Sequence, residues 1–183
     1  MKNNVIMKVL LHDCCAPCGA YVIEELQKDG HKVTVYFYNP NIFPEEEYNL
    51  RLDEMKKYCE KYSVDLIVGK YEHDEWLEFI KGLENEPEKG KRCEKCFQKR
   101  LAEVAQKANE ESFEAYASTL TISPHKPAEM INKIGHEFAE FYSLKYIDTI
   151  WRKNDGFRKS CKLSEDEDFH RQNYCGCEFS IRD

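Results

Sequence analysis

Leu10-Leu11-His12-Asp13-Cys14-Cys15-Ala16-Pro17-Cys18-Gly19 is the stretch that decides the fold of this chain. An apolar run, Val5–Leu11, leads into it and predicts a buried strand. Ala16–Gln27 follows with the spacing of a helix, so three cysteines fall in a strand-to-helix turn. Open α/β sheets bind ligands at this end of their strands, and a helix N-terminus favours thiolate over thiol. The turn is therefore a candidate metal site.

Four of the other six cysteines form two close pairs, which brings the candidate ligands to seven. These are Cys14, Cys15, Cys18, Cys93, Cys96, Cys175 and Cys177. We expect the three groups to meet in space as one metal site. A zinc ion and a cubane iron–sulfur cluster each take four protein ligands, so seven thiols suit two centres, or one centre and a reactive pair. Cys59 lies on the apolar face of a predicted helix and is expected in the core, whereas Cys161 has no neighbouring partner.

The bulk composition is that of one globular domain over residues 1–183. Apolar residues make up 42% of the chain and charged residues 33%, and no apolar stretch is long enough to cross a bilayer. The N-terminus lacks the cleavage pattern of a signal peptide, so we expect a cytoplasmic protein without membrane contact. In that reducing compartment nine cysteines favour metal or redox chemistry over disulfides. Because the net charge is −7, we expect any contact with nucleic acid to be confined to a local group of basic residues.

Strand and helix patterns alternate along the chain. Strands are expected over 5–11, 31–38, 64–68, 113–117 and 143–150, and helices over 16–27, from Pro44 onward, and over 74–81, 91–108, 130–142 and 164–171. This order favours a mostly parallel sheet covered on both faces, which is a three-layer α/β fold. After Trp151 the chain becomes a polar, Cys-rich C-terminal tail that carries Cys175 and Cys177.

Several residues have two readings. Cys93 and Cys96 also suit a separate structural zinc, and Cys175 and Cys177 also suit a flexible tail. His12 can ligate metal, donate a hydrogen bond or lie buried against the backbone. Asp13 is either a proton donor or solvated. The basic residues of the last third are either a solvated surface or an anion-binding rim; they are Lys126, Arg152, Lys153, Arg158, Lys159 and Arg171.

Five blocks in one order resemble the epoxyqueuosine reductase QueH family over nearly the whole chain. The blocks are Leu11–Cys18; Tyr38–Ile42 with Glu47, Tyr48 and Arg51; Gly90–Phe97 with Arg100 and Leu101; Ser118–Leu120 with Ser123–Lys126; and Arg171–Cys177. The resemblance implies a Rossmann-like fold of the PP-loop and nucleotide hydrolase type. The Ser-Gly-Gly phosphate loop of ATP pyrophosphatases is missing, so we do not expect ATP use.

The resemblance also implies a reaction. Members of the family remove the epoxide oxygen from epoxyqueuosine at the wobble position of a tRNA anticodon, the last step of queuosine synthesis. They use a 4Fe-4S cluster with a further metal ion, here expected to be iron, and an external electron donor. Deoxygenation needs two electrons and two protons, and a neighbouring metal would bind the epoxide oxygen as a Lewis acid.

Roles for single residues follow as hypotheses. Our first division gives the cluster Cys15, Cys93, Cys96 and Cys175, and gives the second metal Cys14, Cys18 and Cys177. His12, Asp13 and Tyr174 are the candidate catalytic proton donors. Lys126, Arg152, Lys153 and Arg171 are the candidate contacts to anticodon phosphates.

Two other functions compete with this reading. One is a zinc-stabilised nucleic-acid or protein binding module without redox chemistry. The other is an iron–sulfur tRNA-thiolating enzyme of the same broad fold, against which the missing ATP loop argues. An iron–sulfur protein is brown and a zinc protein is colourless, so the colour of the purified protein distinguishes the two.

Overall fold

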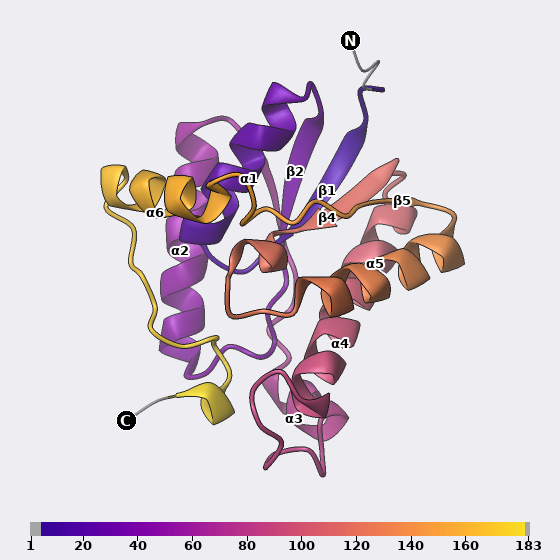
Figure 1. Ribbon diagram of the computed structural model, residues 1–183, viewed down its shortest axis with the longest axis vertical. Coiled ribbons are helices and arrows are strands. Elements are labelled where there is room, and N and C mark those ends of the chain that lie inside the picture. The colour runs from indigo at the N-terminus through magenta and orange to yellow at the C-terminus, as the bar shows by residue number, and fades with distance from the viewer. Residues whose placement is uncertain (1–4, 182–183) are drawn as a thin grey trace.

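The computed structural model describes residues 5–181, in which five parallel strands form one twisted sheet (Figure 1). The strands are β1 (Lys8–Asp13), β2 (Lys32–Phe37), β3 (Asp65–Val68), β4 (Ala115–Ser118) and β5 (Lys145–Ile147). Their order across the sheet is β3-β2-β1-β4-β5, so β1 is central. All four neighbouring pairs are parallel, as the alternation of elements predicts.

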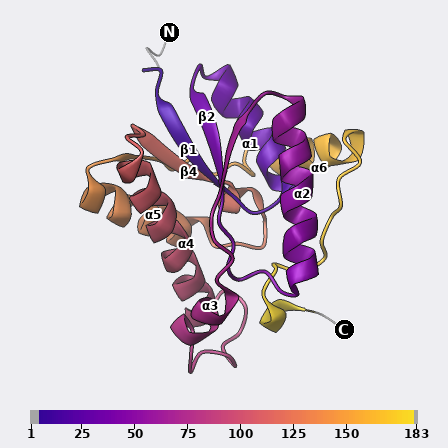
Figure 2. The same cartoon turned by 180° about the vertical axis from the view of Figure 1, so that it is seen from behind.

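Helices cover both faces of the sheet and complete the predicted three layers (Figures 1 and 2). They are α1 (Ala16–Lys28), α2 (Glu45–Lys61), α3 (His73–Phe79), α4 (Lys91–Glu110), α5 (Ala128–Tyr142) and α6 (Gly156–Asp166), with short 3₁₀ turns η1 (Thr119–Ile122) and η2 (Glu178–Ser180). Helices α1, α2 and α6 lie on one side, and α4 and α5 on the other.

Alternation along β1 explains how one strand serves both cores. Val9 and Leu11 face the core that α1 and α2 close, whereas Leu10 faces the core that α4 and α5 close. Successive side chains of a strand point to opposite faces, so a strand buried on both sides is a continuous apolar run. This is the pattern that Val5–Leu11 shows, although the strand itself begins at Lys8.

Two predicted elements differ from the structure. The last strand is β5, three residues long, rather than 143–150, because only 145–147 pair with β4. The last helix is α6, which ends at Asp166, so the helix predicted over 164–171 was wrong in all but its first turn. Helix α6 packs against α1, where the Ser160 hydroxyl donates a hydrogen bond of 3.0 Å to the carbonyl of Pro17. The buried residues of α6 are Gly156, Ser160 and Ser164, which hydrophobic periodicity does not reveal.

The order of the strands determines where the candidate site lies. Strands β1 and β4 are neighbours, and His12 lies opposite Ser118 where both strands end. The cysteine turn after β1 and η1 after β4 therefore meet at the same edge of the sheet, where parallel α/β folds bind ligands. Within residues 5–181 no helix combines the length and the apolar character needed to cross a bilayer.

Candidate metal centre

Cys14, Cys15 and Cys18 form a compact group at the end of β1, which we call the turn cysteines. Their sulfur atoms all lie within 4.8 Å of one another, and those of Cys14 and Cys15 are 3.8 Å apart. Cys15 is the N-cap of α1, and Pro17 stands in the first turn of the helix. The backbone of the helix start thus fixes the three sulfurs.

A second group, the wall cysteines, consists of Cys93 and Cys96 at the start of α4 and Cys175 and Cys177 near η2. Cys96 and Cys177 pack in one buried cluster with Trp76 and Ile80. The expectation of a Cys-rich tail needs correction here: the compact thiol group lies in the N-terminal turn, and the tail contributes two thiols from the other side.

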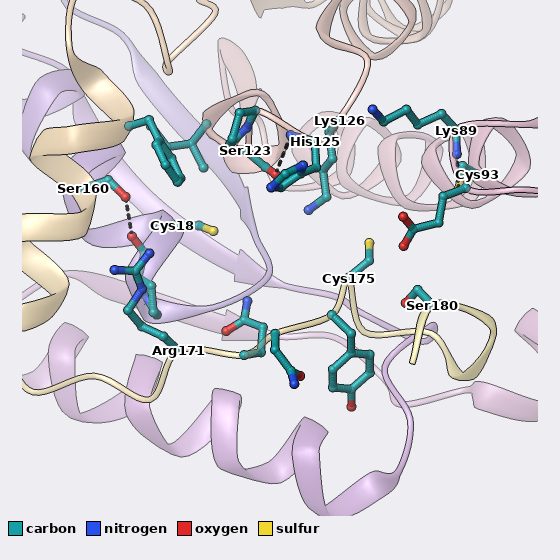
Figure 3. Close-up of a pocket in the computed structure, with 18 of the residues that line it drawn as sticks. Cys18, Lys89, Cys93, Ser123, His125, Lys126, Ser160, Arg171, Cys175 and Ser180 are labelled. Carbon is teal, nitrogen blue, oxygen red and sulfur yellow. Dashed lines mark hydrogen bonds between the residues drawn. The ribbon is translucent and has the colours of Figure 1, made fainter. Parts of the chain in front are cut away.

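A cavity of about 350 Å³ joins the two groups. Cys18, Cys93, Cys175 and Cys177 line it, and Lys126 reaches into it (Figure 3). In Figure 3 the side chains of Cys18, Lys126 and Cys175 turn toward the same space. The three cysteine segments thus surround one cavity; whether their sulfurs bind metal stays a prediction.

The thiols differ in their acidity. The neighbouring Cys15 and Cys18 thiols donate to the sulfur of Cys14 and lower its pKa well below the ordinary value, and Lys126 adds to this effect. The pKa values of Cys15 and Cys18 rise because Cys14 takes the negative charge. Burial raises the pKa of Cys96 to about 12. Cys14 is therefore the turn cysteine that holds a thiolate first, and the fully buried wall cysteine Cys96 needs a cation to hold one.

His12 is a buried neutral residue of the strand end. Its Nε2 lies 3.1 Å from the carbonyl oxygen of Tyr38 and its Nδ1 lies 3.0 Å from the hydroxyl of Ser118. Because a carbonyl only accepts, Nε2 carries the proton. Burial, with Arg100 nearby, lowers the pKa of His12 to about 3. Both ring nitrogens are occupied, which favours the reading of His12 as a buried residue with a backbone partner.

Asp13 is a buried carboxyl group beside the turn cysteines. Within residues 5–181 neither of its side-chain oxygens has a hydrogen-bond partner of good geometry. Burial raises its pKa well above the usual value, and the charge of Cys14 adds to the shift. A protonated carboxyl group beside a metal site is a proton donor, which keeps Asp13 as a candidate.

Residues 167–177 form a strap that follows α6 and closes one side of the cavity. The Gln172 amide donates to the sulfur of Cys15 over 3.1 Å, and the Tyr174 hydroxyl donates to the carbonyl of Phe43 over 2.6 Å. Arg51 lies 5.4 Å above the ring of Tyr174. The hydroxyl of Tyr174 thus already has an acceptor, and its role as a proton donor stays a prediction.

The four predicted phosphate contacts divide into two kinds. Lys126 and Arg171 line the cavity, and Arg171 also approaches the sulfur of Cys161 at 3.2 Å. The guanidinium of Arg152 instead donates to the carbonyls of Ser123 and Lys126, over 3.3 and 3.2 Å. Lys153 is exposed and does not line the cavity.

Sequence reasoning gave no roles to three residues that position the site: Arg51, Arg100 and Gln172. Arg51 and Arg100 are 1% exposed, although arginine is rarely buried without a partner. Arg51 pairs with Glu47 over 2.6 Å and also reaches the carbonyl of Cys175 at 3.4 Å. All three residues lie in the matching blocks, but an arginine on a helix gives no sign of burial in one sequence.

Fold and site together define a Rossmann-like α/β protein with a thiol-rich centre at the carboxyl edge of its sheet. The family model for the epoxyqueuosine reductase QueH matches residues 9–183. The chain belongs to this family.

Curated relatives agree over nearly the full chain. The epoxyqueuosine reductase QueH of Acinetobacter baylyi is 44% identical over 177 residues, which cover 96% of this chain and 81% of that protein. The protein of the same name from Thermotoga maritima is 35% identical, covering 94% of this chain and 90% of its own length.

Solved structures support the fold alone. The U34-tRNA thiolase NcsA from Methanococcus maripaludis, solved with its [4Fe-4S] cluster, superposes with a TM-score of 0.59 at 14% identity. The match covers 97% of this chain but 63% of that one, so this chain spans less than two thirds of the thiolase. A predicted tRNA methyltransferase subunit from Methanocaldococcus jannaschii matches with a TM-score of 0.57, covering 86% of this chain and 74% of its own.

Proposed function

We propose that this chain reduces epoxyqueuosine to queuosine in tRNA, removing the epoxide oxygen at the wobble position of the anticodon. Membership of the QueH family over residues 9–183 is the observation that carries the proposal. The site suits reductive chemistry because four thiols from all three cysteine segments line one cavity, and Cys14 and Cys15 lie beside Cys18. The reaction consumes two electrons from an external donor and two protons, breaks both C–O bonds of the epoxide, and leaves an alkene and water.

The spacing of the turn cysteines suits a single metal ion. Metal–sulfur bonds of about 2.3 Å in a tetrahedral site place two sulfurs about 3.8 Å apart. This is the separation of Cys14 and Cys15. Three thiolates leave a fourth position open, which is the arrangement of a catalytic metal.

The wall cysteines suit a cluster. A cubane takes four thiolates, each on a different iron, so its ligands lie farther apart than those of one ion. The four wall cysteines come from two segments and provide this number. We therefore assign Cys93, Cys96, Cys175 and Cys177 to a 4Fe-4S cluster. We assign the turn cysteines to a second metal ion, which we expect to be iron. This proposal differs from our first division in two residues: Cys15 is grouped with Cys14 and Cys18, beside which it lies, and Cys177 is grouped with Cys96, with which it packs.

When bound, these groups would supply single electrons and a Lewis acid for the epoxide oxygen. The chain itself supplies charge and protons at the cavity. Lys126 places an ammonium between Cys18 and Cys175, where it stabilises thiolate charge or a phosphate of the substrate. Asp13, whose pKa is raised by burial, is the proton donor that we favour, with His12 and Tyr174 held in place by their carbonyl partners.

Contact with the tRNA backbone is local. Among the predicted residues, Lys126 and Arg171 line the cavity, whereas Arg152 holds the loop that carries Lys126. We expect Arg171→Ala to weaken tRNA binding and to lower the salt dependence of binding by about one ion. Lys153→Ala is the control variant, because Lys153 is exposed, lies next to Arg152 and does not line the cavity. Equal binding in wild type and Arg171→Ala would remove Arg171 from the interface.

Anaerobic purification with counts of iron, sulfide and zinc is the first test. We expect about four irons with matching sulfide, plus one further metal ion. Serine variants of the wall cysteines should lose sulfide, whereas variants of the turn cysteines should keep sulfide and lose the extra ion. Cys59→Ala is the control, because Cys59 packs in the core against Met55.

Activity is measured on tRNA that contains epoxyqueuosine, with a chemical reductant. A brown protein that converts this tRNA supports the reductase. A colourless protein with one zinc, which still binds tRNA but converts nothing, would overturn the proposal in favour of the zinc-stabilised binding module.

A further inference from the structure

Arg100 is a cation in the interior of the protein. It is 1% exposed, and its Nη2 donates to the Asn39 side-chain oxygen over 2.7 Å. Its Nε has no hydrogen-bond partner in the part of the chain that the structure describes. A buried guanidinium is costly unless an anion compensates its charge, and the amide of Asn39 is neutral.

The groups that can compensate Arg100 are sulfurs of both cysteine groups, which become thiolates when they bind metal. Arg100 follows Cys96 by four residues in α4, so the two share a face of the helix. Burial alone would lower the pKa of Arg100, yet that pKa is raised because Cys96, Cys14 and Cys175 lie near enough to stabilise the charge.

Asn39 ties Arg100 to the other half of the site. The Asn39 amide donates to the carbonyl of Asp13 over 2.8 Å, directly before the turn cysteines. Through these two hydrogen bonds the neutral side chain of Asn39 holds Arg100 between the wall cysteines and the turn cysteines. The other buried arginines have different partners: Arg51 pairs with Glu47, and Arg92 donates to the carbonyls of Glu84 and Glu86 and stacks on Phe179.

We propose that Arg100 is a positioning residue whose guanidinium balances the thiolate charge of the metal centre and raises its reduction potential. The inference rests on the proposed function, because it assumes the iron–sulfur centre. Net charge and hydrogen bonds around the sulfurs set the potential of such clusters, and a fixed cation favours the reduced, more negative state. The site would then accept electrons from a weaker donor than an uncompensated cluster needs.

The experiment compares Arg100→Met, which removes the charge and keeps most of the volume, with Arg100→Lys, which keeps the charge. The reduction potential of each reconstituted protein is measured by redox titration followed by electron paramagnetic resonance. In Arg100→Met we expect the ratio of reduced to oxidised cluster at a fixed potential to fall at least tenfold. For a one-electron couple this corresponds to a shift of 59 mV in the reduction potential. Arg100→Lys should retain most of the wild-type potential.

A second measurement compares loaded and metal-free protein and separates charge balance from a structural role. Metal binding adds the thiolate charge that Arg100 compensates, so loading should raise the urea midpoint by more in wild type than in Arg100→Met. Leu101→Ala, a neighbouring buried change without charge, should lower that midpoint and leave the potential unchanged.

Each outcome of these experiments either supports or overturns the inference. An unchanged potential in a loaded Arg100→Met protein overturns the inference alone, and so does a gain in urea midpoint on loading equal to that of wild type. If Arg100→Met takes up no cluster, Arg100→Lys must still take one up, and its failure to do so overturns the inference. A wild-type protein that takes up no iron overturns the proposed function and this inference with it.

Discussion

The side-chain amide of Gln172 donates a hydrogen bond of 3.1 Å to the sulfur of Cys15, across 157 positions of sequence. The strap therefore does more than deliver Cys175 and Cys177, because it also reaches over the cavity to the turn cysteines. Hydrogen bonds to ligating sulfurs orient them and tune the metal.

Gln172→Ala removes this donor without touching a cysteine. We expect it to weaken metal binding at the turn cysteines by 10- to 100-fold, on the order typical for the loss of an outer-shell partner. A chelator competition with the extra metal ion measures this. Gln106→Ala, at an exposed glutamine that bonds Glu110, is the matched control. Metal affinity equal to that of wild type would mean that the Gln172 contact has no role in holding Cys15.

Arg51 and Glu47 form a buried ion pair within α2. The side chain of Arg51 is 1% exposed and that of its partner Glu47 is 13% exposed. Arg51→Met leaves Glu47 without this cation, so we expect the free energy of unfolding of metal-free protein to fall by about 3 kcal/mol. Urea unfolding measures the loss. Lys28→Met, which breaks exposed pairs with Glu24 and Glu25, should cost less than about 1 kcal/mol. Equal losses in the two variants would contradict a buried ion pair.

Gly19 leaves room for Asp13. A Cβ at position 19 would lie 2.7 Å from both Asp13 Oδ1 and the terminal carbon of Met55. Both are ends of side chains, so Gly19→Ala should shift the carboxyl group at a cost of about 1 kcal/mol in stability. We expect turnover to fall far more than stability does, because the substitution displaces the proposed proton donor beside the turn cysteines. Gly82→Ala, where no atom lies within 4 Å, should leave turnover unchanged. Full activity in Gly19→Ala would remove Asp13 from the reaction.

His12 makes the stability of the metal-free protein depend on pH. Burial, with Arg100, lowers its pKa to about 3 in the folded protein, against 6.5 when unfolded. Between these values the unfolded chain binds the additional proton, so stability is lost as pH falls from 6.5 toward 3. From pH 7 to pH 5 wild type should lose about 2 kcal/mol more than His12→Asn, by the linkage slope for one proton. Parallel pH profiles of the two proteins would show that His12 is protonated when folded.

Much of the fold follows from local patterns. The apolar run before His12, the cysteine turn and the helix from Ala16 predict a central strand that ends in a ligand site, and β1 and α1 confirm this. Periodicity reports burial on one or two faces, which sheet and helix packing requires. It failed at α6, whose buried residues are Gly156, Ser160 and Ser164 and in which Leu163 packs against the core.

The sequence by itself determined which residue types are available: seven paired or clustered cysteines, a strand-to-helix turn, and five blocks of the QueH family. Only the tertiary structure decided that the three cysteine segments meet, because the distance in space between Cys18, Cys93 and Cys175 is not defined by spacing along the chain. It also decided that Arg100 lies buried against thiols while Arg152 braces a loop. Charge compensation acts over distances in space, and in a single sequence nothing marks which cation will lie beside which sulfur.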